Sequence, residues 1–126
     1  MKKTLQSPNA PSAVGPYSQG VRSGDFMFFS GQIPIDPATG NIEATDITGQ
    51  TKQCIANIKA LLSEQGCTLD NVVKSTVFLA DMSLFAGMNE VYASEFSAPF
   101  PARSTIAVRE LPKSSLVEIE VIARVF

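Results

Sequence analysis

Residues 26–29, Phe-Met-Phe-Phe, place apolar side chains on both faces of any strand that they form. Successive side chains of a strand point to opposite faces of the sheet, so a strand with water on one side alternates between apolar and polar residues. This segment does not alternate. The sheet that contains it must therefore be covered on both faces, by helices of the chain or by a partner molecule.

The order of the predicted elements shows how much of this cover the chain supplies. Hydrophobic periodicity predicts strands over residues 3–6, 18–22, 26–30, 72–80, 103–109 and 116–126, and helices over 47–65 and 83–96. Asp46 and Gly66 are typical start and stop signals for the first helix. The second helix has its apolar stripe at Leu84, Met88, Val91 and Tyr92. A short strand followed by ββαβαββ predicts one α+β domain over 1–126, with both helices on one face of the sheet.

Arg103 begins a predicted strand, and the alternation of that strand places Thr105 on the same face. If a hairpin joins this strand to the last one, Thr105 lies near Glu120, and Arg103, Thr105, Glu118 and Glu120 share one face. A guanidinium that binds a carboxylate, with acid side chains one strand away, would hold a small organic acid and move a proton beside it.

The same pattern has a simpler interpretation, because cross-strand Arg–Glu pairs are common on protein surfaces and contribute less than about 1 kcal/mol each. The uncovered face favours a functional site. With helices for one face only, the other is expected to pack against a second copy of the chain, so that the Arg103 face lines a subunit interface. An Arg–Glu pair partly removed from water is better suited to chemistry than an exposed pair.

The absence of histidine excludes Ser-His-Asp triads, histidine acid–base catalysis and most zinc sites. The two cysteines, Cys54 and Cys67, are about 18 Å apart along the first helix and its end, which is too far for a disulfide. Both are expected to be structural, and neither a metal nor an organic cofactor is expected. The chemistry must use Arg, Glu, Tyr, Ser, Thr or backbone groups.

Charge and hydropathy narrow the possible partners. The net charge is −2 and the isoelectric point is near 5.0, which argues against nucleic acid because surfaces that bind it cluster Lys and Arg. No segment approaches the roughly 20 apolar residues of a membrane span, and residues 1–8 lack the apolar run of a signal peptide. A cytoplasmic protein without membrane contact is expected.

Five short motifs, in this order along the chain, resemble those of the RidA/YjgF family. They are Gly-Pro-Tyr-Ser-Gln at 15–19, Ser-Gly-Gln-Ile-Pro at 30–34, Lys-Ser-Thr-Val-Phe-Leu at 74–79, Phe-Pro-Ala-Arg-Ser-Thr at 100–105 and Val-Glu-Ile-Glu at 117–120. The resemblance implies a chorismate-mutase-like α+β fold and a homotrimer whose sheets form a central barrel, with three clefts between subunits. It also implies an enamine/imine deaminase, which hydrolyses reactive 2-imino acids formed by PLP-dependent dehydratases to 2-keto acids and ammonia.

The resemblance also implies roles for individual residues. Arg103 corresponds to the carboxylate-binding arginine of the family and Glu118 to the acid that positions or activates water. Other cleft positions correspond to Tyr17, Ser30, Gly31 and Asn89, and Thr105 stands where many members have Cys. Each also has an ordinary structural interpretation: a ring packed over a loop for Tyr17, a strand end for Ser30 and Gly31, and a solvated helix position for Asn89. At position 105 the thiol is absent, but the backbone carbonyl can still hold a water.

Three functions remain open at this point. In the enzyme, Arg103 would bind the carboxylate of the 2-imino acid and Glu118 would direct a water to its C2 atom. In a binding protein, the same cleft would sense a 2-keto acid or another small carboxylate without turnover. In the third, the surface would have an RNA-directed or chaperone role. The presence of both Arg103 and Glu118 favours the enzyme, while Glu120 is expected to pair with a basic neighbour and is the alternative catalytic acid.

Overall fold

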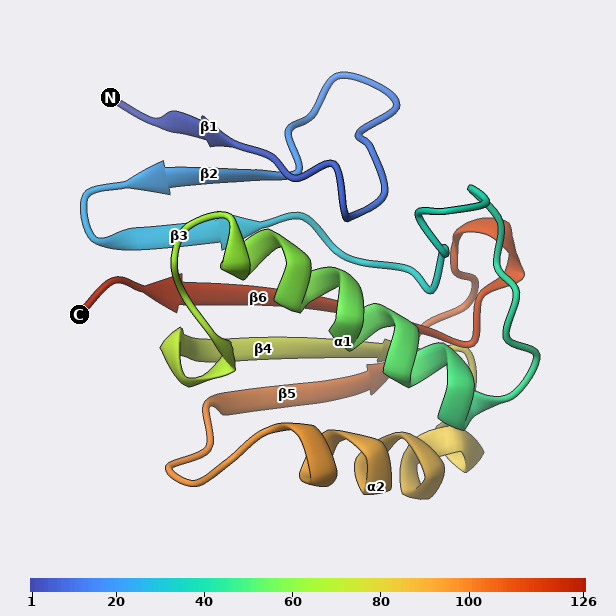
Figure 1. The fold of residues 1–126 in the computed structure, drawn as a ribbon. Helices are drawn as coiled ribbons and strands as arrows, with labels where there is room; N and C mark the ends of the chain where they lie inside the picture. The colour runs from blue at the N-terminus through green and yellow to red at the C-terminus, as the bar shows by residue number, and fades with distance from the viewer.

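The computed structural model describes all of residues 1–126. Its centre is a six-stranded sheet with the strand order β1-β2-β3-β6-β4-β5 (Figure 1). The strands are β1 (Lys3–Leu5), β2 (Gly20–Ser23), β3 (Phe26–Phe29), β4 (Val72–Leu79), β5 (Ala102–Ala107) and β6 (Val117–Arg124). The α-helices are α1 (Ile47–Ser63) and α2 (Phe85–Glu95), and short 3-10 helices cover Leu69–Asn71, Met82–Leu84 and Pro112–Ser114. Every predicted strand and helix is present.

Helix α1 has the predicted signals at both ends. The Asp46 carboxylate accepts a hydrogen bond from the Gly49 N–H at 2.8 Å and so caps the first turn. After the helix, Gly66 has a φ of +69°, the left-handed conformation that favours glycine. The Cys67 N–H then donates to the Leu62 carbonyl at 3.0 Å, a bond typical of a helix C-terminus.

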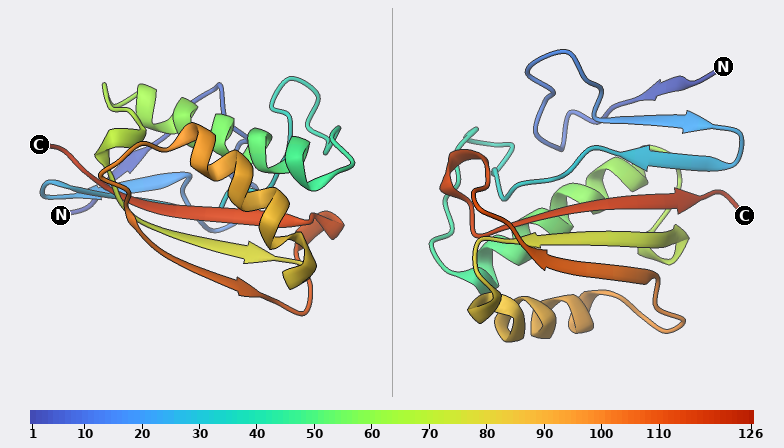
Figure 2. Two further views of the ribbon diagram at one scale, coloured as in Figure 1. Left: turned by 90° about the horizontal axis from the view of Figure 1, so that it is seen from below. Right: turned by 180° about the vertical axis from the view of Figure 1, so that it is seen from behind.

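Helix α2 packs beside α1 on the same face of the sheet (Figure 2). Its buried residues Met88, Val91 and Tyr92 belong to the predicted apolar stripe. The helix starts two residues later than predicted, because a 3-10 turn capped by Asp81 precedes it. Neither α-helix has the length and apolar character needed to span a lipid bilayer.

The connection between β5 and β6 differs from the predicted hairpin. β5 pairs in parallel with β4, and β6 lies on the other side of β4, antiparallel both to it and to β3 (Figure 1). Helix α2 is the cause, because a crossover helix returns the chain to the start of the next strand and makes β4 and β5 parallel. The last strand then occupies the middle of the sheet, between β3 and β4.

This topology separates the predicted site residues. The β4 partners of Arg103 and Thr105 are the fully buried Ser75 and Val77, so both residues face the helices. Glu118 and Glu120 alternate with buried residues of β6 and therefore point to the opposite face. The expectation that these four residues share one face is wrong, because it depended on a hairpin that the chain does not form.

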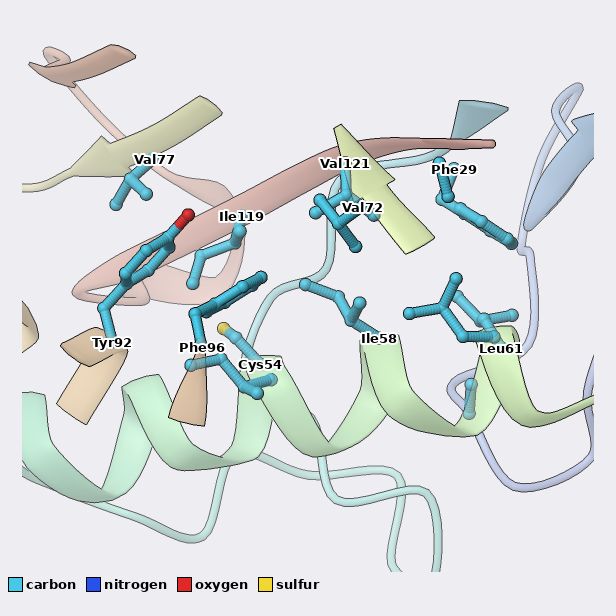
Figure 3. Close-up of a cluster of buried hydrophobic side chains, with 14 of the residues drawn as sticks. Phe29, Cys54, Ile58, Leu61, Val72, Val77, Tyr92, Phe96, Ile119 and Val121 are labelled. Atoms are coloured by element: carbon cyan, nitrogen blue, oxygen red, sulfur yellow. The ribbon is translucent and has the colours of Figure 1, made fainter. Parts of the chain in front are cut away.

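The helices cover one face of the sheet only (Figure 2). Between them and the sheet lies a cluster of 21 buried hydrophobic residues, part of which Figure 3 shows. Met27 and Phe29 belong to this cluster, whereas Phe26 and Phe28 on the other face are 41% and 43% exposed. The predicted two-faced strand is confirmed, and this chain covers just one of its faces.

Candidate functional site

One group of the predicted site residues lines a pocket of about 560 Å³ beside the start of β6. Tyr17, Ser30, Gly31 and Glu118 all belong to its wall, together with Glu120. These residues come from the loop before β2, the segment after β3, and β6 itself. Segments far apart in the sequence therefore meet at this pocket.

Gly31 and Glu118 are in direct contact. A Cβ atom on Gly31 would overlap the Glu118 carboxylate and would lie 2.9 Å from its Cδ atom. The chain runs beside β6 here, and Gln32 and Ile119 exchange backbone hydrogen bonds of 2.8 and 3.1 Å. Only glycine at position 31 lets the carboxylate lie against the backbone, so its contribution to the site is its lack of a side chain.

Ser30 and Tyr17 are held by the loop that precedes β2. The Ser30 hydroxyl donates to the Ser18 carbonyl at 2.6 Å, which leaves the hydroxyl oxygen free to accept a hydrogen bond. The Tyr17 ring lies over Gly15, as its structural interpretation expects, and its hydroxyl accepts from the Val14 N–H at 3.4 Å. The Tyr17 side chain is nevertheless 53% exposed, so its ring remains accessible to a ligand.

Burial raises the pKa of Glu118 above its ordinary value, and the negative charge of Glu120 raises it further. A carboxyl group with a raised pKa exchanges protons more readily near neutral pH. Glu120 itself forms no ion pair within the chain, whose single salt bridge joins Lys59 and Glu95. The predicted pairing of Glu120 with a basic neighbour is not made within this chain: the nearby Lys74 donates instead to the Ser104 hydroxyl of β5.

The second group of site residues surrounds Arg103 at the start of β5, against helix α2. The Nη1 atom of Arg103 donates a hydrogen bond of 2.8 Å to Oδ1 of Asn89. The guanidinium carbon lies 4.6 Å from the centroid of the Tyr92 ring and 5.6 Å from that of the Phe85 ring. Both distances are within the range of cation–π attraction. The helix positions 85, 89 and 92 are spaced by four and three residues, so all three partners come from one face of α2.

No carboxylate of this chain pairs with Arg103. The cross-strand Arg–Glu pair of the simpler interpretation is therefore not formed within the chain. A single N–H group of the guanidinium has a hydrogen-bond partner, the Asn89 amide oxygen. A half-buried arginine with free donors is suited to binding a carboxylate through two parallel hydrogen bonds.

Thr105 follows Arg103 on the same face of β5, and its hydroxyl oxygen is buried without a hydrogen-bond partner. Buried hydroxyl groups are usually paired. The Thr105 hydroxyl is therefore an unusual buried group without a hydrogen-bond partner, and it lies two residues along the strand from Arg103.

The two groups do not meet within one chain. Arg103 and Glu118 lie on strands separated by β4, three residues out of register. With ordinary strand spacing their Cα atoms are about 14 Å apart, and their side chains point to opposite faces. A small organic acid cannot contact both residues of the same chain.

Sequence reasoning missed Phe85 and Tyr92 as neighbours of Arg103. The apolar stripe of α2 accounts for Tyr92 as a core residue, and the side chain is indeed only 4% exposed. The spacing of Asn89 and Tyr92 could have indicated this contact. The two residues are three positions apart, so a helix that presents Asn89 to the site presents Tyr92 beside it.

No group of three or more Cys, Asp or Glu side chains is arranged to bind a metal ion. Cys54 and Cys67 are buried and free, as their predicted structural role requires. Burial raises the pKa of the Cys54 thiol far above its ordinary value, so the reactive thiolate is disfavoured.

Comparisons with known proteins agree with the motifs. The family described as Endoribonuclease L-PSP matches residues 7–125. A RutC family protein of Pyrococcus horikoshii is 52% identical over 123 residues, which are 98% of each chain. A 2-iminobutanoate/2-iminopropanoate deaminase of Salmonella typhimurium is 45% identical over 126 residues, again 98% of each chain. The crystal structure of a Rid family protein from Yersinia pestis has a TM-score of 0.96 and 47% identity, and the match covers 99% of this chain and 100% of that one. This chain belongs to the RidA/YjgF family, which the description Endoribonuclease L-PSP denotes.

Proposed function

We propose that this protein hydrolyses reactive 2-imino acids and their enamine tautomers to 2-keto acids and ammonia. The observation that carries the proposal is the Arg103 guanidinium, which Asn89 orients and no carboxylate of the chain neutralises. Glu118, a carboxyl group whose pKa is raised by burial, supplies the acid–base group. The 45% identity to a 2-iminobutanoate/2-iminopropanoate deaminase supports the same reaction.

The reaction suits these residues because an imine carbon is already electrophilic. Hydrolysis then requires orientation, a directed water and a proton donor, but no covalent nucleophile. Arg103 binds the substrate carboxylate, and Glu118 takes a proton from the water as the water oxygen adds to C2 of the N-protonated imine. The carbinolamine that forms carries a hydroxyl and an amino group on C2. Return of the proton to the nitrogen allows ammonia to leave, and the hydroxyl loses its proton as the keto group forms.

We place this site between copies of the chain. Arg103 and Glu118 lie on opposite faces of one sheet, and the uncovered face exposes Phe26 and Phe28. In a homotrimer whose sheets pack into a central barrel, Arg103 of one subunit meets Glu118 of the partner subunit in each of three clefts. The further lining residues of the cleft are Tyr17, Ser30, Gly31, Asn89 and Thr105.

The direct test generates the imine in solution. A dehydratase that forms 2-iminobutyrate or 2-iminopropionate is mixed with the protein, and keto-acid release is timed against the same mixture without it. We expect faster release with the protein. Release at the spontaneous rate across several imino acids would contradict the enzymatic function.

A second candidate is a non-catalytic sensor of 2-keto acids. It is favoured by the same free guanidinium, which fits any small carboxylate whether or not it reacts. Calorimetry with 2-ketobutyrate separates the candidates, because a sensor binds the keto acid while imine hydrolysis continues at its spontaneous rate.

A further inference from the structure

We infer that Tyr92 positions the Arg103 guanidinium and that Ser75 fixes Tyr92 for this purpose. The inference rests on the proposed function, in which this guanidinium binds the substrate carboxylate. It adds to that function two positioning residues, one on α2 and one on β4, that lie beneath the arginine in the protein interior.

The Tyr92 ring contacts two planar groups. The guanidinium carbon of Arg103 is 4.6 Å from the ring centroid. The ring also stacks on Phe96, with centroids 4.2 Å apart and planes inclined by 16° (Figure 3). Phe96 therefore restrains the Tyr92 ring that the guanidinium contacts.

The tip of the ring is attached to the sheet. The Tyr92 hydroxyl and the Ser75 hydroxyl form a hydrogen bond of 2.7 Å, and the two side chains are 4% and 0% exposed. Burial raises the pKa of the Tyr92 phenol, which keeps it protonated and able to donate. Because Ser75 is the direct β4 partner of Arg103, the three residues form a closed triangle of strand pairing, hydrogen bond and cation–π contact.

The other constraint on the guanidinium comes from Asn89, which accepts from its Nη1 atom at 2.8 Å. Asn89 therefore restrains the guanidinium by a hydrogen bond, and Tyr92 restrains it by the contact with its ring. A guanidinium restrained in both ways loses less conformational entropy when it binds a carboxylate. Since the carboxylate is bound in the ground state and in the transition state alike, loosening the restraint should raise KM and leave kcat nearly unchanged.

The first experiment measures the position of Arg103 in the free protein by NMR. A ring beneath the guanidinium shifts the Arg103 side-chain signals upfield, and the signals are assigned by their loss in Arg103→Lys. We expect this shift in the wild type and a large loss of it in Ser75→Ala. Wild-type signals at their random-coil positions, or an unchanged shift in Ser75→Ala, would overturn the inference without any ligand.

The second experiment measures KM, kcat and the affinity for 2-ketobutyrate. Ser75→Ala and Tyr92→Phe should each raise KM about three- to tenfold, with kcat within about twofold of the wild type. Product affinity should fall by the same factor as KM rises. The double variant should cost little more than the worse single variant, because both changes remove the same hydrogen bond.

The matched control is Ser115→Ala, which removes a buried serine hydroxyl that has no hydrogen-bond partner. It should change neither KM nor the Arg103 signals. Folded Ser75→Ala and Tyr92→Phe proteins with wild-type KM would contradict the positioning role while leaving the proposed function intact. A different result would support the positioning role but refute the proposed function. In it, the upfield shift of the Arg103 signals is present in the wild type and lost in Ser75→Ala, yet the wild-type protein accelerates the hydrolysis of no imine.

Discussion

Replacing Gly31 with alanine should remove most of the activity and leave the fold intact. The new Cβ atom would overlap the Glu118 carboxylate and lie 2.9 Å from Cδ and 3.1 Å from Cγ of that residue. Gly31 is not among the residues with positive φ, so alanine introduces no backbone strain there. The overlapped group is the end of a flexible side chain that can rotate away. The free energy of unfolding should therefore fall by an amount at the low end of the about 1–3 kcal/mol typical of overpacking.

The catalytic loss should be larger than the loss of stability. The Glu118 carboxylate must move by about 1 Å to restore an ordinary contact, and a displacement of this size at a reacting group can slow a reaction by about a hundredfold. This factor corresponds to about 2.7 kcal/mol in the activation free energy. Gly31→Ala should thus lower the stability of the protein slightly and its catalytic rate strongly.

The coupled dehydratase assay gives kcat and KM for Gly31→Ala, and thermal unfolding gives its stability. The control is the same change in a Glu118→Gln background. Because Gly31→Ala acts through the Glu118 carboxylate, the double variant should be little slower than Glu118→Gln alone. Wild-type kcat in Gly31→Ala, or a further hundredfold loss in the Glu118→Gln background, would refute the reasoning.

Arg103→Lys should lower kcat/KM by about a hundredfold or more, because an ammonium cannot form two parallel hydrogen bonds with a carboxylate. The exposed Arg109 lies beyond the end of β5, so Arg109→Lys is the control and should stay within about twofold of the wild type; near-normal turnover of Arg103→Lys would give the arginine a structural role only. Glu118→Gln should slow hydrolysis yet keep keto-acid affinity in calorimetry, since the amide hydrogen-bonds but cannot accept the proton; an unchanged rate would move the acid–base role to another group. Light scattering should report about three times the chain mass of 13.5 kDa, and a stable monomer at micromolar concentration would exclude both the trimer and a site shared between subunits.

Local features of this chain could be predicted because local sequence carries them. Asp46 caps α1 through a bond to a residue three positions away, and Gly66 ends the helix through its own backbone conformation. The apolar residues on both faces of β3 likewise predicted a sheet that needs cover on both faces, and the two predicted helices indicated that the chain itself covers one. Five ordered motifs identified the family, and so singled out Arg103 and Glu118, before any geometry was known.

The relation between those two residues depended on the tertiary structure. Alternation correctly indicated which residues share a face within each strand, but the face of one strand relative to another depends on which strands are neighbours. The α2 crossover inserts β4 between β5 and β6, and this places Arg103 and Glu118 on opposite faces. Likewise, Tyr92 is an ordinary core residue by helical spacing. Its contact with Arg103 exists only because β5 returns parallel to β4 and brings the arginine against α2, a long-range pairing that no local pattern encodes.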